Sequence, residues 1–451
     1  MGQSMHSGAV NYSSAVNRGG AMNRSSAMNP TPVLFAEPID PPVGQTRELT
    51  QNQRERRDAV QRSVITLLVA STILLIIGIF MVFSATSASS IRAVDRYGEG
   101  VGLFSVAIRQ VFWAVLGVIG AVVLAILPYR LIERMCYVIF AGACIMQLAV
   151  VFFGKEVAGN TNWLKIGGLQ LQPSEFLKLA VIVWLAHVIG RLRVPQMADL
   201  HALALPVGGL TIATGLVLLP GDMGTSIVYV LIGLGMLWLA GLPLKYLGIV
   251  FGAGIVGAGA LIAIQPSRLS RVTSYFNNLF STPGLKEPSQ ADFAQFAFGT
   301  GGWSGLGIGA GKEKWRDLKE AHTDFIFAVI GEELGLFGSI IIVVLFLVLA
   351  WAFLRLIVNH PFRYGQLLSA GAGLWICGQA FLNMCVVTGL LPVFGVPLPF
   401  LSQGGSALMA TLFMIGIVIS CAMSVPGVKE SLRIRSTLVH RARAVLRRKD
   451  A

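Results

Sequence analysis

Asp324 is the residue of this sequence best placed to do chemistry. It ends the run His322-Thr323-Asp324, directly before Phe325 and an apolar segment long enough to cross a membrane. A carboxylate at a membrane rim stays ionised while it is partly desolvated, and this raises its basicity toward that of a general base. A helix cap formed by Thr323 or Asp324 explains the same pattern. The sequence therefore predicts either a general base or a cap at this position.

A second candidate site lies between Trp163 and Lys178. Pro173 suits the first turn of a helix, and Glu175 and Lys178 are then three residues apart and able to pair. One interpretation is a buried pair that neutralises itself. The other is a polar spot that faces a cavity, with Lys178 available to a phosphate. Trp163 is either an interfacial anchor or a stacking surface for a sugar.

Three further segments contain turn residues. Pro220-Gly221-Asp222 separates two apolar segments and places an acid at the outer face. The segment Pro397–Ser406 precedes the last apolar segment, where exposed backbone N–H groups would suit a phosphate, although a plain re-entrant turn fits equally. The glycine run 305–311 follows no strand and lacks the P-loop pattern, so it predicts a backbone that approaches a ligand or merely bends.

Glu332 and Glu333 follow Asp324 within the same apolar segment. On a continuous helix, Glu332 would lie about 80° from the face of Asp324 and Glu333 roughly opposite it. The two carboxylates therefore cannot share one site on an unbroken helix. The small residues Gly331, Gly335 and Ser339 indicate helix packing.

The composition is that of a membrane protein. The chain has 451 residues, of which 54% are hydrophobic and 13% charged, and its mean hydropathy is +0.70. Apolar runs of membrane-crossing length recur, and because they are continuous rather than alternating they predict helices and not a barrel. The net charge of +13 gathers in tails and short loops, which indicates anionic lipid headgroups and argues against nucleic acid.

We predict an all-α polytopic membrane protein with ten transmembrane helices. The predicted spans are 64–86, 104–127, 135–153, 174–190, 203–219, 222–240, 244–264, 325–354, 366–390 and 406–425. Basic residues concentrate in alternate loops and in both tails, so both termini are predicted to be cytoplasmic.

Three regions follow from this topology. Residues 1–62 form a low-complexity cytoplasmic tail that is predicted to be disordered, residues 63–426 the membrane domain, and residues 427–451 a basic cytoplasmic tail. The long outer loop 265–324 joins helices seven and eight. Because it is rich in aromatic residues, we expect partial amphipathic helices on the membrane surface.

Four motifs in this order resemble the SEDS family, the shape, elongation, division and sporulation proteins of the bacterial cell wall. They are Gln172-Pro173-Ser174-Glu175, Glu320–Phe325, Glu332–Gly335 and Ser402–Ser406. The resemblance covers residues 64–425, and the long basic tails favour the division (FtsW-like) branch over the elongation (RodA-like) branch. The chain departs from the family pattern at Thr161-Asn162, where an arginine is frequent.

The resemblance implies a peptidoglycan glycosyltransferase that polymerises lipid II. The growing glycan is transferred, with inversion, from undecaprenyl pyrophosphate to the sugar hydroxyl of the next lipid II. The catalytic aspartate of the family falls on Asp324, and its functional tryptophan and glutamate fall on Trp163 and Glu175. Lys178 and Arg109 are expected to neutralise the pyrophosphate. The other residues expected to contact substrate are His322, Thr323, Ser402, Gly404, Gly405 and Ser406.

The resemblance also implies partners and a location. The partners are a class B penicillin-binding protein transpeptidase and the proteins of the divisome. The location is the bacterial cytoplasmic membrane at the septum, with the active site on the outer face. No tightly bound cofactor or transition metal is expected, while Mg²⁺ or Mn²⁺ could assist the leaving group. The alternatives are a lipid II flippase, an elongation-type polymerase and a scaffold.

Overall fold

A computed structural model describes residues 51–97, 105–157, 160–166, 169–193, 196–197, 199–264, 273, 290–315 and 321–430. Most of the predicted N-terminal tail, most of the basic C-terminal tail and most of the first half of the long outer loop lie outside these residues.

Nearly all of the described chain is helical. The helices are α1 (Gln51–Tyr97), α2 (Ser105–Ile126), α3 (Tyr129–Arg134), α4 (Cys136–Phe153), α5 (Pro173–Gly190), α6 (Leu200–Leu218), α7 (Met223–Leu239), α8 (Leu244–Ile264), α10 (Gln290–Gly301), α11 (Ile326–Asn359), α12 (Arg363–Gly373), α13 (Gln379–Val387) and α14 (Gly405–Met423). A single turn of 3₁₀-helix spans Glu313–Trp315, and a π-helical turn, Leu374–Gly378, joins α12 to α13.

Each of the ten predicted spans coincides with a helix or with the joined pair α12–α13. Within the described residues, eight helical stretches are long and apolar enough to cross a membrane, and α7 is a shorter apolar helix. The chain is therefore a multi-pass, all-α membrane protein. The total of ten crossings and the cytoplasmic side of both termini stay predictions.

The first helix is longer than predicted. It begins at Gln51 rather than at residue 64, so the last part of the tail predicted to be disordered is helical. Gln51 donates a hydrogen bond to the Glu55 carboxylate at 3.3 Å, four residues along the same helix. Ala59 and Val60 are buried, and this packing supports a helix that the polar sequence alone does not indicate.

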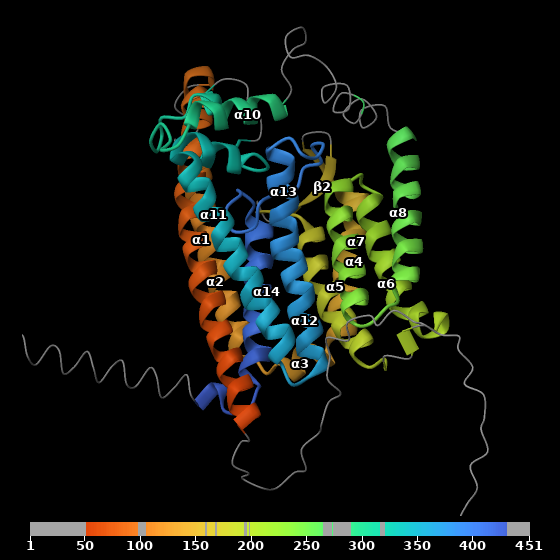
Figure 1. Cartoon of the computed structure of the whole chain (residues 1–451). Helices are drawn as coiled ribbons and strands as arrows, with labels where there is room; N and C mark the ends of the chain where they lie inside the picture. The colour runs from red at the N-terminus through yellow and green to blue at the C-terminus, as the bar shows by residue number, and fades with distance from the viewer. Residues whose placement is uncertain are drawn as a thin grey trace, which may run out of the picture.

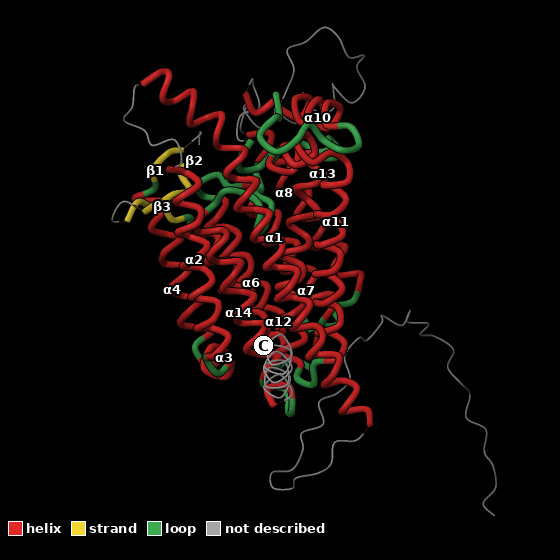
Figure 2. The backbone as a smooth tube through the Cα atoms, turned by 90° about the vertical axis from the view of Figure 1, so that its left-hand side faces the viewer, coloured by secondary structure: helices red, strands yellow, loops and turns green. Residues whose placement is uncertain are grey.

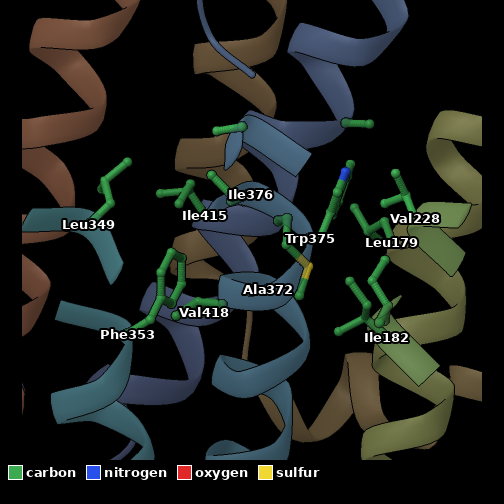
Figure 3. Packing of buried hydrophobic residues seen from close by; sticks show 14 of the residues in the cluster. Leu179, Ile182, Val228, Leu349, Phe353, Ala372, Trp375, Ile376, Ile415 and Val418 are labelled. Carbon is green, nitrogen blue, oxygen red and sulfur yellow. The ribbon is translucent and has the colours of Figure 1, made fainter. Parts of the chain in front are cut away.

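The helices form one bundle whose centre is occupied by α5 and α14 (Figure 1). These two bury 89% and 83% of their most apolar 18-residue windows, whereas α4 buries 22%. The α14 helix packs against α2, α1 against α11, and α4 against α5, while α8 stands at one edge. Trp375 is fully buried between the central helices, with Leu179 and Val228 close to its ring (Figure 3).

Glycines bring α2 and α14 together closely. A Cβ on Gly120 would overlap the ring of Phe413, and a Cβ on Gly416 would overlap the main-chain oxygen of Ala121. Small residues at such an interface let two backbones approach, because helix association in lipid depends on packing and not on the hydrophobic effect.

A small sheet interrupts the helical fold and was not predicted. Its strands are β1 (Lys155–Val157), β2 (Asn160–Ile166) and β3 (Leu169–Leu171), paired antiparallel in that order. The sheet lies at one end of the bundle, above α2 and α4 (Figure 2). The α10 helix lies at the same end, as expected for a partial helix of the outer loop.

Candidate active site

Asp324 lies in the turn directly before α11 and is half-buried. Asn383 of α13 holds this turn, because its side-chain amide donates to the main-chain oxygens of Asp324 at 2.8 Å and Val396 at 2.7 Å. A Cβ on Gly395 would lie 3.4 Å from Asp324 Oδ2, so the carboxylate lies beside the backbone of the loop before α14. The N-cap of α11 is Phe325, one residue after Asp324.

The loop before α14 is fastened to the turn that carries Asp324. The Ser402 hydroxyl donates to the main-chain oxygen of Thr323 at 2.6 Å and accepts from Leu398 N at 2.7 Å. Gln403 N donates to the main-chain oxygen of His322 at 2.8 Å. These contacts use the main-chain oxygens of His322 and Thr323 and thereby fix the backbone next to Asp324.

Gln110 of α2 joins the same loop. Its Oε1 accepts from Gly404 N, and its Nε2 donates to the main-chain oxygen of Ser402, both at 3.4 Å. Arg109, the neighbouring residue, is exposed. The backbone of Gly405 faces the Trp113 indole, which a Cβ at position 405 would strike.

The start of α5 meets the start of α14. Gln172 N donates to Ser406 Oγ at 3.2 Å, and the Gln172 side chain donates to Asp222 Oδ2 at 3.3 Å. Asp222 is the N-cap of α7 and accepts from Thr225 N at 3.0 Å. Three of the predicted polar segments thus share one end of the bundle.

Glu175 and Lys178 form the internal ion pair that the sequence allowed. Lys178 Nζ lies 2.8 Å from Glu175 Oε1 and 3.0 Å from Gln379 Oε1, and it lies 5.2 Å from the centroid of the Trp375 ring. Both side chains of the pair are almost fully buried, at 1% and 2% exposure. Gln379 Nε2 donates to the main-chain oxygen of Pro397 at 2.7 Å. Of the two interpretations of this pair, the structure shows the buried one, and the Lys178 ammonium is linked through Gln379 to the loop before α14.

Trp163 lies on β2, opposite Lys155 of β1, and is half-buried. The strand lies at the end of the bundle that also holds α10 (Figure 2). The structure thus places Trp163 at the same end as the outer loop, on the side of α2 and α4.

The acidic pair Glu332–Glu333 lies where α11 is broken. Gly335 has φ 70° and ψ −165°, so the helix predicted to be continuous over 325–354 is interrupted. The glycine-rich segment 301–311 fills the break, where Leu306 N donates to the main-chain oxygen of Glu332 at 3.0 Å. The prediction of an unbroken helix is wrong because another segment supplies hydrogen-bond partners to the backbone at the break.

The two carboxylates bind different partners. Glu332 Oε1 accepts from Lys312 N at 2.6 Å. Glu333 Oε1 lies 2.5 Å from Lys314 Nζ and 2.7 Å from Ser84 Oγ of α1. Because Glu333 and Lys314 are both fully buried, this pair anchors the segment before Asp324 against α1 and α11.

The described residues contain no group of three or more His, Cys, Asp or Glu side chains that could hold a metal ion. Magnesium is often held by one or two carboxylates together with substrate phosphates and water. Asp324 fits that description as a single protein ligand.

Three residues that position the site were not predicted: Gln110, Gln379 and Asn383. Each is an uncharged amide inside an otherwise apolar helix, and each is buried with at least one hydrogen bond to a main-chain oxygen. The sequence did carry a signal for them, because a polar group in a membrane helix costs free energy unless it has a partner.

The fold and the gathered polar groups define a multi-pass membrane protein with a structured site at one end of its bundle. Residues 65–426 match the family model of the FtsW/RodA/SpoVE cell cycle proteins. The chain belongs to this family.

Curated relatives support the same conclusion. The protein named "Probable peptidoglycan glycosyltransferase FtsW" from Mycobacterium tuberculosis is 36% identical over 370 residues, which cover 81% of this chain and 69% of the relative. Stage V sporulation protein E from Bacillus subtilis is 34% identical over 364 residues, covering 78% and 95%.

Solved structures share the fold. The rod shape determining protein RodA of Thermus thermophilus matches with a TM-score of 0.58 at 25% identity, covering 80% of this chain and 96% of RodA. A chain from the structure described as "Structural coordination of polymerization and crosslinking by a peptidoglycan synthase complex" matches with a TM-score of 0.64 at 24% identity, covering 80% and 98%.

Proposed function

We propose that this chain polymerises peptidoglycan glycan strands from lipid II at the outer face of the bacterial cytoplasmic membrane, with Asp324 as general base. The chain is a peptidoglycan glycosyltransferase, because curated relatives named for this activity are 32–36% identical to it over most of its length. The substrate, the membrane face and the roles of individual residues are our proposals.

One observation supports the proposed site above all others. The turn that carries Asp324 is bonded to the loop before α14, and that helix is bonded at Ser406 to the start of α5. Segments that are far apart in the sequence are thus joined through the loop that lies beside the half-buried Asp324 carboxylate. A general base needs such a fixed position and partial desolvation.

The proposed reaction is an inverting displacement. Asp324 takes the proton of the acceptor sugar hydroxyl, whose oxygen attacks the anomeric carbon of the donor glycan. The bond from that carbon to the pyrophosphate breaks, and the pyrophosphate leaves with the electron pair. Arg109 is the exposed cation that we assign to the leaving group, since Lys178 is enclosed.

The test compares Asp324→Asn with Asp199→Asn in lipid II polymerisation by the purified full-length chain. Loss of a general base lowers the rate by about 10²–10⁴-fold. Asp199 is an exposed N-cap of α6, so its variant removes the same charge outside the proposed site. Wild-type activity in Asp324→Asn would eliminate Asp324 as the base. A lipid II transporter predicts no glycan product from any of the three proteins.

A divalent cation, Mg²⁺ or Mn²⁺, would bind the pyrophosphate and Asp324 and would supply positive charge to the leaving group. We expect chelation to lower the rate and either ion to restore it. Full activity in chelator would show that Arg109 and neutral donors suffice.

We assign the chain to septal synthesis together with a class B penicillin-binding protein and the divisome. Several curated relatives carry the name FtsW, and one neighbouring structure is described as a complex that polymerises and crosslinks. Depletion of a division polymerase produces filamentous cells, and a fluorescent fusion gathers at midcell. Depletion that rounds the cells instead would favour the elongation alternative.

A further inference from the structure

A hollow lies between α1, α2 and α14, and Asp324 does not line it. It has a volume of about 540 Å³, which lies within the range of pockets for organic ligands. Leu68 and Leu75 of α1, Val118 of α2, and Leu412 and Ile415 of α14 form part of its apolar wall. Its other end reaches α3, at the end of the bundle opposite to the sheet and α10 (Figures 1 and 2).

Two hydroxyls of the wall are already bonded. Ser71 Oγ donates to the main-chain oxygen of Leu67 at 2.6 Å in its own helix. The Ser420 hydroxyl donates to the main-chain oxygen of Leu127. Because these hydroxyls have partners and most of the other residues of the wall are apolar, the wall offers water few places to bind. The apolar wall therefore favours a hydrocarbon chain as the occupant of the hollow.

The mouth of the hollow is cationic. Arg130 of α3 and Lys429, which follows α14, both line it and are both exposed. The Arg130 guanidinium donates from Nε to the Tyr129 hydroxyl at 3.5 Å. None of the described residues that line the hollow is acidic, and Glu133, the acid of α3, pairs with His187 at 3.2 Å.

We propose that this groove, bounded by α1, α2 and α14, binds an anionic phospholipid. One acyl chain lies along the apolar wall, and the headgroup phosphate lies between Arg130 and Lys429. An acyl chain gains little hydrophobic free energy by leaving the bilayer for the groove, since lipid tails are as apolar as the wall. The selectivity of the groove therefore comes from its two cations, each of which favours an anionic headgroup about fivefold.

Native mass spectrometry of the purified full-length chain in detergent tests this proposal. Phosphatidylglycerol and phosphatidylcholine with the same acyl chains are titrated in parallel. The variant Arg130→Gln/Lys429→Gln removes the cations of the mouth, and Ala125→Phe fills the groove, which Ala125 lines. The control Arg193→Gln/Lys245→Gln removes two exposed cations that do not line the groove.

We expect phosphatidylglycerol to bind the wild type more tightly than phosphatidylcholine. The double variant of the mouth should lose about twenty-five-fold in affinity for phosphatidylglycerol, and the control should lose much less. Ala125→Phe should weaken both lipids. Equal losses in the two double variants would mean attraction to surface charge alone, and equal binding of the two lipids to the wild type would mean ordinary boundary lipid. Either result, or unchanged binding in Ala125→Phe, would overturn the proposal.

Discussion

Replacing Gly335 by alanine should detach the glycine-rich loop from α11. The φ of 70° and ψ of −165° at this position belong to a region that only glycine adopts readily, and another residue there costs about 1–3 kcal/mol. A Cβ would also lie 2.6 Å from Trp303 O and 2.7 Å from Ser304 C. These are backbone atoms, so the loop can relieve the contact only by moving away from the helix.

The movement would break hydrogen bonds across the break. Leu336 N donates to Gly302 O at 2.9 Å, and Gly307 N donates to Glu333 O at 3.0 Å. Each such bond contributes about 1 kcal/mol. The strain and one or two lost hydrogen bonds together destabilise the closed loop by about 3 kcal/mol. Because about 1.4 kcal/mol corresponds to a factor of ten in an equilibrium constant, the equilibrium for local opening of the loop should rise roughly a hundredfold.

Hydrogen exchange of the full-length protein measures this opening in peptides that cover 302–307 and 332–337. Two glycines provide graded controls. Gly307 has φ 100°, but a Cβ there would meet open space, so Gly307→Ala introduces strain without a collision. Gly208 lies within α6 and also faces open space, so Gly208→Ala should leave the loop unchanged. Our reasoning is refuted if Gly335→Ala exchanges like the wild type or no faster than Gly307→Ala.

Three further predictions concern buried charges and use apparent melting temperatures in detergent. Lys314→Met should destabilise the protein by about 3–5 kcal/mol because it leaves the Glu333 carboxylate buried without its cation. The double variant Lys314→Met/Glu333→Leu should recover most of this loss. If it recovers none, the ion-pair argument is contradicted. Lys178→Met should likewise destabilise the protein because it leaves Glu175 buried without its cation, and Glu175→Leu/Lys178→Met should recover most of that loss. A double variant that is less stable than Lys178→Met would show that contacts other than the ion pair dominate. Burial lowers the pKa of the His360 imidazole in the folded protein below its ordinary value of about 6.5. The neutral side chain therefore contributes fully to stability above pH 6.5, and this contribution is lost as the pH falls from 6.5 through the lower pKa of the folded state. The melting temperature should thus fall more steeply below pH 6.5 in the wild type than in His360→Gln, and parallel curves would exclude this effect.

The sequence determined the membrane fold because hydropathy is a local property. Every predicted span coincides with a helix, since a long apolar segment in lipid must satisfy its backbone within itself. The ion pair of Glu175 with Lys178 was also foreseeable, because residues three apart on a helix are neighbours. The start of α1 at Gln51 could not be predicted, because the helix there is supported by the burial of Ala59 and Val60, which the polar sequence alone does not indicate.

The tertiary structure alone decided how the site is assembled. The bond between Gln172 and Ser406 joins residues 234 positions apart, and that between Ser84 and Glu333 joins residues 249 apart. Nothing local to either partner specifies such a contact, because it depends on which helices pack together. The break at Gly335 has the same origin, since a loop from elsewhere in the chain supplies hydrogen-bond partners to the interrupted helix. The sequence thus indicated which polar residues could do chemistry, and the packing of distant segments decided which of them meet, as Gln172 and Ser406 do, and which, like Lys178, are enclosed.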